Sequence, residues 1–506
     1  MSYRFNTADS AIIDRVCEIN NISAQDLDIS NFKPDYEIDL LKDFKEKILS
    51  LKDKRFFIVG DYDCDGICAT AIMKKLLDDL KISNNYYIPS RSKEGYGLNE
   101  KIVDTAIENG FDVLLCVDNG VVAKEELLKA RNNKITTLII DHHEYGDIPD
   151  VDGLLHPALF TEEYDDMCAG GLCALLSNSF RYDEYTTVLG GLATLADMVK
   201  VFGYNRFLLK EMINLLNNNI FVPINYLSGT SLFTYEGLSF NVIPKINAIS
   251  RLEEKMNVNH MVRFLLNYND EANQYLNTIE AINKQRKELT KSMVSLSQRL
   301  IDNSKDVIVL KSDVFVEGLC GLIANRLMYE YNKPVIVLSV CGTQLKGSGR
   351  SPKGSNLYTY LKNTENLFNA FGGHAQAVGL SIDDGKYDSF IEYIDNNSFT
   401  YPEIEKDVLV IRQNDIDESL IEQLDMLKPF GSGFEEPLIG INELQIEKRI
   451  IISKGYPKFI LNDSLEAIGF NSVFADKQFN MIIGKIKRDD YYHNKLSMII
   501  EDLIEF

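Results

Sequence analysis

The sequence contains no apolar stretch that approaches the ~20 residues of a membrane span. Residues 1–6 show none of the charged-then-apolar pattern of a secretory signal. No C-x-x-C pair suggests a zinc site, and the eight cysteines are scattered along the chain. In a chain without a signal pattern we expect such cysteines to be reduced. These absences predict a cytoplasmic globular protein with no membrane partner.

An excess of positive charge is also absent, since the formal net charge is −22 at pH 7. Proteins that bind duplexes without sequence preference usually carry a broad basic surface, so that class is disfavoured. A local basic groove remains compatible with the sequence. Residues 281–300 are basic with helical spacing, although a solvated helix face would look the same. Lys346, Arg350 and Lys353 lie in a Gly/Ser-rich stretch that predicts a phosphate-contacting turn at 346–354.

What the chain does have is a short apolar run that ends in aspartates. The run Phe56–Val59, followed by Gly60, predicts a buried parallel strand. Asp61, Asp63 and Asp65 come at every second position just past its carboxyl end, where open α/β sheets place their ligands. Because crowded carboxylates repel one another, their expected partner is a hard divalent cation bound through oxygen.

An EF-hand calcium loop begins with a similar spacing of aspartates. Such a loop requires a bidentate Glu at its twelfth position, which is Ile72 here. A strand rather than a helix also precedes the aspartates, so the calcium-loop interpretation fails. A solvated acidic turn remains the alternative when this motif is considered alone.

Two further apolar runs end in acidic or imidazole clusters. Residues 113–117 lead into Asp118, and residues 137–140 lead into Asp141, His142 and His143. Helical patterns at 68–80, 100–109 and 123–132 separate the runs. This alternation predicts a parallel sheet whose three clusters meet at one edge. A fourth acid, Asp197, follows a helical stretch and would, taken alone, be an ordinary helix-end carboxylate.

The rest of the chain predicts two more folded regions. Strands at 306–310 and 334–340 and helices at 318–331 and 356–363, with a loop at 372–374, indicate a second, smaller α/β domain. From about residue 407 the sequence changes to short alternating runs. These predict a small β-barrel with strands at 408–411, 438–446, 458–461, 465–470 and 481–486.

The order of these motifs resembles the DHH phosphoesterase family. The four family motifs match residues 61–66, 118–120, 141–143 and 196–197. Further segments are similar to the RecJ branch and its DHHA1 domain: 89–91, 94–99, 244–248 with Arg251, 318–327, 333–337, 347–351 and 372–375. Residues 427–433, with Glu436 and Pro437, resemble the RecJ entry into an OB-like domain.

This resemblance implies an α/β fold class. A parallel-sheet DHH domain would be joined by a long helix to a smaller α/β DHHA1 domain, followed by a β-rich OB-like domain. The expected divisions are an N-terminal helical arm at 1–54, the DHH catalytic domain at 55–210, a helical connector at 211–300, the DHHA1 substrate-binding domain at 301–400 and the OB-like domain at 401–506.

The resemblance also implies a catalytic site with two Mn²⁺ or Mg²⁺ ions. Asp118 is then the bridging carboxylate, and Asp63, Asp65, His142 and Asp197 complete the ligand set. Asp61 is either a ligand or a support behind the ligands. As catalytic residues, Asp141 would orient His142 or His143 through a ring N–H, and His143 would contact the scissile phosphate.

The same resemblance implies a binding region for the 5′-phosphate end of single-stranded DNA. Its expected members are Arg91, Tyr96, Asn247, Arg251, Ser348, Arg350 and His374. Taken singly, each arginine would more often be a surface ion-pair partner. The chain departs from the RecJ pattern at residues 249–250, which are Ile-Ser, and at residues 316–317, which are Val-Glu.

The implied function is a metal-dependent exonuclease that degrades single-stranded DNA in the 5′ to 3′ direction during repair and recombination. The implied partners are a single-strand-binding protein or a helicase, and the expected state is a monomer. One alternative is a DHH phosphodiesterase for short oligonucleotides or cyclic dinucleotides, which would not need an OB-like domain. Another is a non-enzymatic replisome scaffold, which is disfavoured because every acid and histidine of the metal motifs is present.

Overall fold

The computed structural model describes residues 2–7, 12–401, 404–488 and 495–505. The chain forms two compact units. The larger unit comprises Pro34–Asp197 and Leu208–Pro402, and the smaller unit comprises Met1–Lys33, Met198–Phe207 and Glu403–Phe506. Among the described residues, no helix combines the length and the apolar character that crossing a membrane requires.

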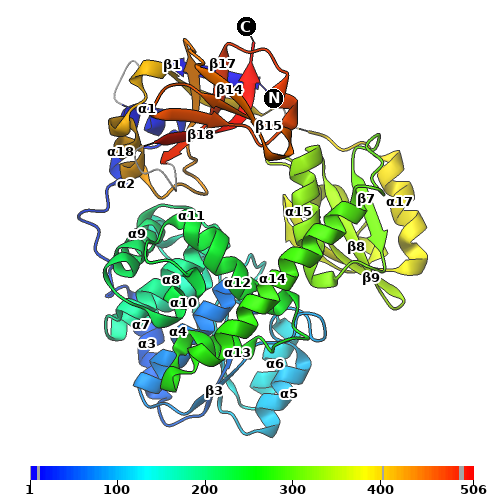
Figure 1. Ribbon diagram of the computed structural model, residues 1–506. Helices are drawn as coiled ribbons and strands as arrows, with labels where there is room; N and C mark the ends of the chain where they lie inside the picture. Colours follow the sequence, from blue (N-terminus) through cyan, green and yellow to red (C-terminus); the bar gives the residue numbers. More distant parts are fainter. Residues whose placement is uncertain (1, 8–11, 402–403, 489–494, 506) are drawn as a thin grey trace. The chain divides into compact units, whose positions relative to one another are not determined.

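A five-stranded parallel sheet forms the first part of the larger unit (Figure 1). Its strand order is β3 (Asn84–Tyr87), β2 (Phe56–Val59), β4 (Val113–Val117), β5 (Thr136–Ile140) and β6 (Gly153–Leu155). Every neighbouring pair is parallel, as predicted for the three central strands. The two edge strands were not predicted, because β3 is polar and β6 is very short.

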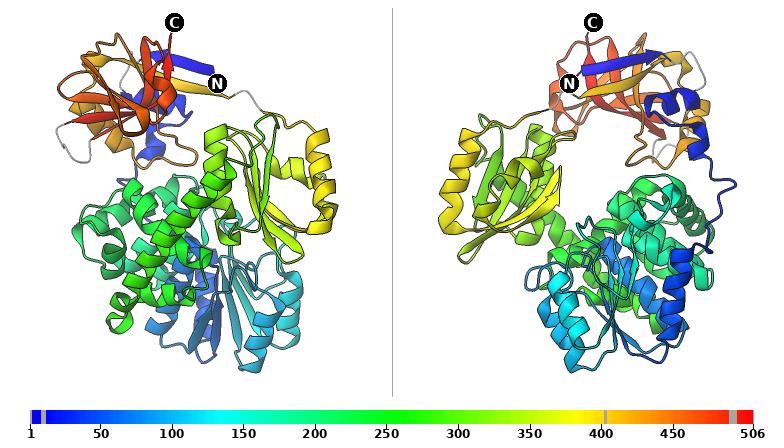
Figure 2. Two further views of the ribbon diagram at one scale, coloured as in Figure 1. Left: turned by 45° about the vertical axis from the view of Figure 1, so that its right-hand side comes forward. Right: turned by 180° about the vertical axis from the view of Figure 1, so that it is seen from behind.

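Helices cover both faces of this sheet (Figure 2). One buried cluster joins the β2 and β4 side chains to α5 (Glu100–Glu108) and α6 (Lys124–Asn132). On the other face lie α3 (Asp39–Ser50), α4 (Cys64–Asp79) and α7 (Ala169–Phe180), and α8 (Glu184–Asp197) packs on α4 and α7. Helix α4 begins four residues before the predicted start, because Asp63 caps it by accepting the N–H groups of Asp65 and Gly66.

A helical region follows the sheet and leads to the second domain. It contains α9 (Gly203–Asn218), α10 (Val222–Ser228), α11 (Tyr235–Gly237), a π-helix (Leu238–Val242), α12 (Ile243–Arg251), α13 (Asn259–Leu266) and α14 (Ala272–Ser297). Helix α14 is the long basic helix predicted at 281–300, and it starts nine residues earlier. Its C-terminal part packs into the core of the second domain through Met293.

The second domain is built on another five-stranded sheet. The strand order is β10 (Phe368–His374), β11 (Ala377–Asp383), β9 (Gln344–Arg350), β8 (Val335–Cys341) and β7 (Ile308–Ser312), in which only β7 and β8 are parallel. Helix α15 (Cys320–Tyr331) covers one face together with α14. Helices α16 (Leu357–Lys362) and α17 (Tyr387–Asn396) cover the other face (Figure 2).

Two predictions for this domain are wrong. Most of the expected turn at 346–354 is strand β9, and the expected loop at 372–374 is the end of strand β10. The glycines serve close packing rather than turning: a Cβ on Gly347 would lie 1.9 Å from the carbonyl oxygen of Val337 on the neighbouring strand. A Cβ on Gly349 would lie 2.7 Å from the Val378 side chain.

The smaller unit contains one eight-stranded sheet, in the order β1, β12, β13, β17, β18, β16, β15, β14. The strands are β1 (Ser2–Thr7), β12 (Glu405–Arg412), β13 (Leu438–Asn442), β14 (Lys448–Ile452), β15 (Tyr456–Ile460), β16 (Leu465–Ile468), β17 (Met481–Arg488) and β18 (Leu496–Ile504). Helices α1 (Ile12–Ile19), α2 (Ala24–Leu27) and α18 (Glu418–Leu427) belong to the same unit. The N-terminal arm is therefore not helical throughout, because β1 pairs in parallel with β12.

Candidate metal centre and adjoining arginine cluster

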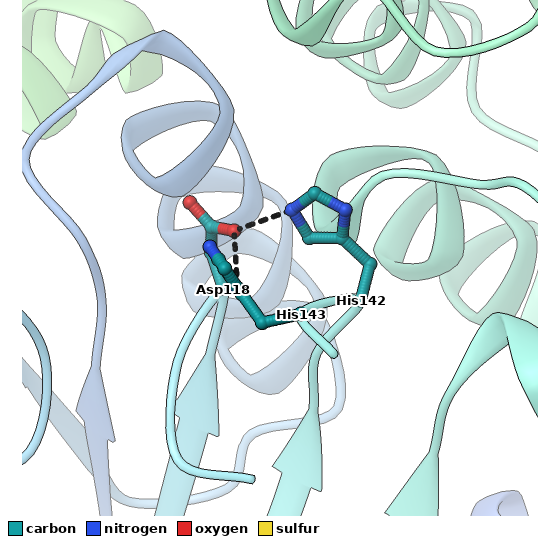
Figure 3. Close-up of side chains that lie close together, drawn as sticks. All are labelled: Asp118, His142 and His143. Carbon is teal, nitrogen blue, oxygen red and sulfur yellow. Dashed lines mark ion pairs between the residues drawn. The ribbon is translucent and has the colours of Figure 1, made fainter. Parts of the chain in front are cut away.

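The acidic and imidazole residues predicted to converge do so at the carboxyl ends of β2, β4 and β5. Asp61, Asp118 and Asp141, which follow these strands, are each at most 2% exposed. Figure 3 shows Asp118 together with two histidines that follow β5. The Asp118 Oδ1 atom lies 3.2 Å from Nε2 of His142 and 4.0 Å from Nδ1 of His143.

Three groups of side chains are close enough to hold metal ions. They are Asp118 with His142 and His143, Asp65 with His142 and Asp197, and Asp61 with Asp63 and Asp118, and within each group the potential ligand atoms lie within 4.8 Å of one another. His142 links the first two groups, since its Nδ1 lies 3.6 Å from Asp197 Oδ2 and its Nε2 lies 3.8 Å from Asp65 Oδ2. All six predicted metal ligands are therefore brought together, including the helix-end carboxylate of Asp197.

The backbone at Asp118 directs its carboxylate into the site. Asp118 has φ +61, a left-handed conformation that Asp and Asn adopt more readily than most residues. Its N–H donates to the Ile140 carbonyl at 2.9 Å. The next residue, Asn119, is buried and donates its amide to the carbonyls of Val59 (3.0 Å) and Val117 (2.8 Å). Asn119 thus links the ends of β2 and β4 through hydrogen bonds, a role that was not predicted.

Asp65 is held by the N-terminus of α7. Its carboxylate accepts the N–H groups of Ala169 (3.0 Å) and Gly170 (2.6 Å), an arrangement that the helix dipole favours. Gly170 is required there, because a Cβ would lie 2.3 Å from Ala193 and 2.8 Å from Asp65 Oδ1. Each carboxylate oxygen has a further lone pair, so these bonds leave Asp65 able to bind a cation.

Asp141 contacts the imidazole ring of His143, which is one of the two alternatives left open by the sequence. Its Oδ1 lies 2.8 Å from His143 Nδ1 and accepts the N–H groups of both histidines, while its Oδ2 accepts the Val121 N–H. The Tyr96 hydroxyl donates to the Asp118 carbonyl at 2.8 Å and lies within 3.1 Å of the His143 ring nitrogens. Tyr96 therefore contacts both Asp118 and His143.

The electrostatics of the site fit a divalent cation. Burial and repulsion from Asp63 raise the pKa of Asp65 to about 7, and burial and repulsion from Asp65 raise that of Asp197 to about 8. Burial also lowers the pKa of His142 to about 3, which leaves the neutral imidazole that a metal requires. The Oδ1 atoms of Asp61 and Asp118 are buried without a hydrogen-bond partner among the described residues. Such oxygens, with an imidazole, suit Mn²⁺ or Mg²⁺.

Close to the acidic residues lies a cluster of arginines, here called the arginine cluster: Arg91, Arg251, Arg286 and Arg350. Burial lowers the pKa of Arg251 to about 9, and the charges of the other three contribute to this lowering. Arg251 donates to the Gly318 carbonyl, and Arg350 to the Gly349 carbonyl. Within the described ranges, no member of the cluster forms an ion pair with a carboxylate. The arginine cluster therefore lacks the anion that would compensate it.

The other predicted substrate residues lie on three different elements: Ser348 on β9, Asn247 on α12 and His374 on β10. Ser348 and Arg350 face the first turn of α15, since a Cβ on Gly321 would lie 3.1 Å from Arg350 and 3.5 Å from Ser348 Oγ. A helix N-terminus adds to the attraction for an anion there. Asn247, on α12, has a buried Oδ1 without a hydrogen-bond partner among the described residues. His374 is exposed at the end of β10, and its charge contributes to the low pKa of His142.

Arg286 was not predicted as a site residue. The sequence assigned it only to the basic character of the long helix, because helical spacing does not reveal which face of α14 packs on α12. In the structure its guanidinium donates to the Asn283 side chain, and burial lowers its pKa. We include Arg286 in the arginine cluster because its charge contributes to the lowered pKa of Arg251.

Family models match three parts of the chain. The DHH family N-terminal domain matches residues 55–197, the DHHA1 domain matches residues 304–397, and the RecJ OB domain matches residues 409–502. Over 470 residues the chain is 27% identical to the single-stranded-DNA-specific exonuclease RecJ of Bacillus subtilis. That alignment covers 87% of this chain but 60% of the relative, so the chain spans less than two thirds of that protein's length.

Two solved structures share the fold. RecJ from Thermus thermophilus in complex with Mn²⁺ superposes with a TM-score of 0.83 at 22% identity, covering 99% of this chain and 80% of that one. A second structure, exonuclease RecJ bound to manganese, has a TM-score of 0.61 at 26% identity, covering 72% of this chain and 95% of that one. The predicted fold class, with its DHH, DHHA1 and OB-like domains in this order, is confirmed. Residues 55–197 thus match the DHH family model, and the three matched domains follow one another in the order DHH, DHHA1 and RecJ OB.

Proposed function

We propose that this protein is a divalent-metal-dependent exonuclease that hydrolyses single-stranded DNA in the 5′ to 3′ direction. The observation that carries the proposal is the pairing of a buried carboxylate and imidazole cluster with a neighbouring arginine cluster that has no carboxylate partners among the described residues. A substrate that carries phosphates at both places satisfies both groups. The names of the relatives, single-stranded-DNA-specific exonuclease RecJ, and the manganese in related structures support this assignment.

Two metal ions would be held by the three groups of ligands around Asp118 and His142. Asp61 and Asp63 group with Asp118, while Asp65 and Asp197 group with His142, which itself groups with Asp118. These residues would hold the two ions, with Asp118 proposed as the shared carboxylate. When bound, the ions supply charge neutralisation for the phosphate and activation of the attacking water.

The protein's own catalytic contribution comes from His143. Asp141 accepts the hydrogen bond of its Nδ1–H, which fixes the ring and favours its protonated form. The Nε2–H of that form would donate to the scissile phosphate or to the leaving oxygen. Tyr96 supports this placement, because its hydroxyl lies beside the His143 ring and holds the Asp118 carbonyl at the same time. These three residues therefore set the distance between the histidine and the metal ligands.

The arginine cluster would determine the 5′ to 3′ direction of hydrolysis. Guanidinium groups bind phosphate oxygens in pairs of parallel hydrogen bonds, and Ser348 adds a hydroxyl donor beside Arg350. A terminal 5′-phosphate bound there places the following phosphodiester toward the acidic cluster. The proposed oligomeric state is a monomer. A single-strand-binding protein or a helicase that supplies the single strand is the expected protein partner.

The proposal is tested by digesting linear single strands labelled at the 5′ or the 3′ end, with Mn²⁺, Mg²⁺ or chelator. The expected result is early release of the 5′ label as a mononucleotide, metal dependence, and resistance of circular single strands. Asp118→Asn should abolish the activity. Asp147→Asn is the matched control, because the Asp147 side chain is 94% exposed and pairs with Lys124 at the surface. Early release of the 3′ label, or cleavage of circles, would contradict the proposal.

A comparison of substrate lengths separates the exonuclease from a phosphodiesterase for short substrates. The smaller unit carries the domain that matches the RecJ OB model, and a dinucleotide is too small to need it. We therefore expect kcat/KM to be higher on a long strand than on a dinucleotide. A clear preference for the dinucleotide would favour the short-substrate enzyme instead.

A further inference from the structure

The segment after strand β3 carries residues of both the metal centre and the arginine cluster. Residues 89–99, here called the 89–99 loop, carry Arg91 of the arginine cluster and Tyr96 beside His143. The Arg91 guanidinium lies over the Tyr62 ring, 5.1 Å from its centroid. Within the loop, Glu94 accepts the Ser90 N–H at 2.8 Å and the hydroxyl of Tyr87. The loop is thus internally ordered, but these bonds alone do not attach it to the arginines on other elements.

The segment between α12 and α13 attaches the 89–99 loop to the elements that carry the other arginines. Glu253 Oε1 accepts the Ser92 N–H at 3.0 Å and also the Ser92 hydroxyl. At the start of the loop, the Asn259 amide accepts the Ile88 N–H at 2.9 Å and donates to the Ile88 carbonyl at 3.0 Å. Ser92 directly follows Arg91, and Glu253 stands two residues after Arg251, the last residue of α12. One carboxylate therefore joins the segments that carry two members of the arginine cluster.

We infer that Glu253 is a positioning residue that sets the preference of the enzyme for a 5′-phosphorylated end. The inference rests on the proposed exonuclease function. The physical reason is that Arg91 and Arg251 repel each other, as the influence of Arg91 on the pKa of Arg251 shows. Before a phosphate binds, the contacts of the 89–99 loop and this carboxylate oppose that repulsion. Holding Arg91 in place beforehand saves the ordering of the loop that binding would otherwise require.

Glu253 can be replaced without disturbing a core. It is only half-buried, and it borders a cavity of about 500 Å³ that is also lined by Glu254, His260 and Tyr275. Glu254 provides a matched control: it is the adjacent carboxylate, it is exposed, and it makes no hydrogen bond or ion pair with the residues that the structure describes. Replacing either residue removes the same charge from nearly the same place.

The experiment measures kcat and KM on otherwise identical single strands with a 5′-phosphate or a 5′-hydroxyl. In Glu253→Ala we expect the ratio of the two kcat/KM values to fall about tenfold, as for a weakened charge-assisted hydrogen bond, through a higher KM on the phosphorylated strand. Glu253→Gln should recover most of the preference, because its amide oxygen still accepts from Ser92. Glu254→Ala should match the wild type. Ser92→Ala, at an exposed position, should give a smaller shift in the same direction.

An Arg91→Ala background shows whether Glu253 acts through Arg91. There, Glu253→Ala should change the preference no further, since coupled residues are not additive. Equal loss on both ends, an unchanged preference in Glu253→Ala, or the same effect in Glu254→Ala would overturn the inference while the exonuclease function stands. A wild type that releases the 5′ label but ignores the end phosphate would also overturn it. A wild type that does not release the 5′ label would refute the proposed function itself.

Discussion

Replacing Asp118 by asparagine should make the metal-free protein more stable while removing its response to metal. Asparagine is the appropriate substitution because Asp118 has φ +61, which Asn adopts readily, whereas Ala there would add roughly 1 kcal/mol of backbone strain. The amide also keeps the shape of the carboxylate beside His142, 3.2 Å away. Loss of charge is therefore the main change.

The expected stability gain follows from the charges around Asp118. Burial, and then repulsion from Asp65, Asp63 and Asp61, raise its pKa well above the ordinary value. A carboxyl whose pKa is raised by folding destabilises the fold when it is ionised, and this penalty is relieved as the pH falls below that pKa. A neutral amide removes it at neutral pH, by roughly 1–3 kcal/mol for a buried group that lacks a partner. At roughly 1–1.5 °C per kcal/mol for a unit of this size, the melting temperature in chelator should rise by about 1–4 °C.

In the presence of Mn²⁺, the wild type should become more stable than Asp118→Asn. At a Mn²⁺ concentration about 100 times its Kd, the wild type gains about 2.7 kcal/mol from binding, and Asp118→Asn should gain little of this. Because Asp118 belongs to two ligand groups, turnover should fall at least about a thousandfold, or ~4 kcal/mol of barrier. Thermal unfolding in chelator and in Mn²⁺, with Asp147→Asn as control, measures the stability effects, and digestion of the labelled strands measures turnover. A variant that is less stable than wild type in chelator, or that still responds fully to Mn²⁺, would refute this reasoning.

Three other substitutions test separate parts of the site. Tyr96→Phe removes the hydroxyl beside His143, so kcat should fall about tenfold while the Mn²⁺-induced shift in melting temperature is kept; an unchanged kcat would contradict this role. Gly170→Ala places a Cβ 2.3 Å from the nearest side chain and should cost roughly 1–3 kcal/mol in unfolding experiments, whereas the control Gly146→Ala, with open space around it, should cost far less. Arg350→Ala should lose about 1.5–3 kcal/mol in kcat/KM on 5′-phosphorylated strands and less on 5′-hydroxyl strands; equal losses would make Arg350 structural.

The metal centre was predictable from the sequence because its geometry follows from one topological rule. Parallel strands end at the same edge, so acids placed after residues 59, 117 and 140 must meet there. Asp197 was identified only through the family resemblance, because nothing local distinguishes it from other helix-end acids. Asn119 and Tyr96 contribute through hydrogen bonds to backbone carbonyls, and sequence spacing does not encode such contacts.

The arginine side of the site was less predictable. Gly347 and Gly349 suggested a turn, but glycine is also the residue required where another strand lies within about 2–3 Å of a Cβ position, and composition cannot separate the two cases. The pairing of β1 with β12 joins residues about 400 positions apart, so no local pattern could indicate it. The attachment of Ser92 to Glu253 is non-local for the same reason.

The two charged clusters of the larger unit also constrain each other. Burial raises the pKa of Asp61 and lowers that of Arg251, and the charges of Arg91 and Asp63, respectively, oppose these two shifts only in part. No ion pair joins the clusters among the described residues. Direct pairing would neutralise both and leave nothing to attract a metal ion or a phosphate. Tyr62 lies between Asp61 and Asp63 in sequence, and its ring holds the Arg91 guanidinium by a cation–π contact that neutralises no carboxylate. Keeping the opposite charges apart would preserve one site for cations and one for a strand end, as the proposed metal-dependent exonuclease requires.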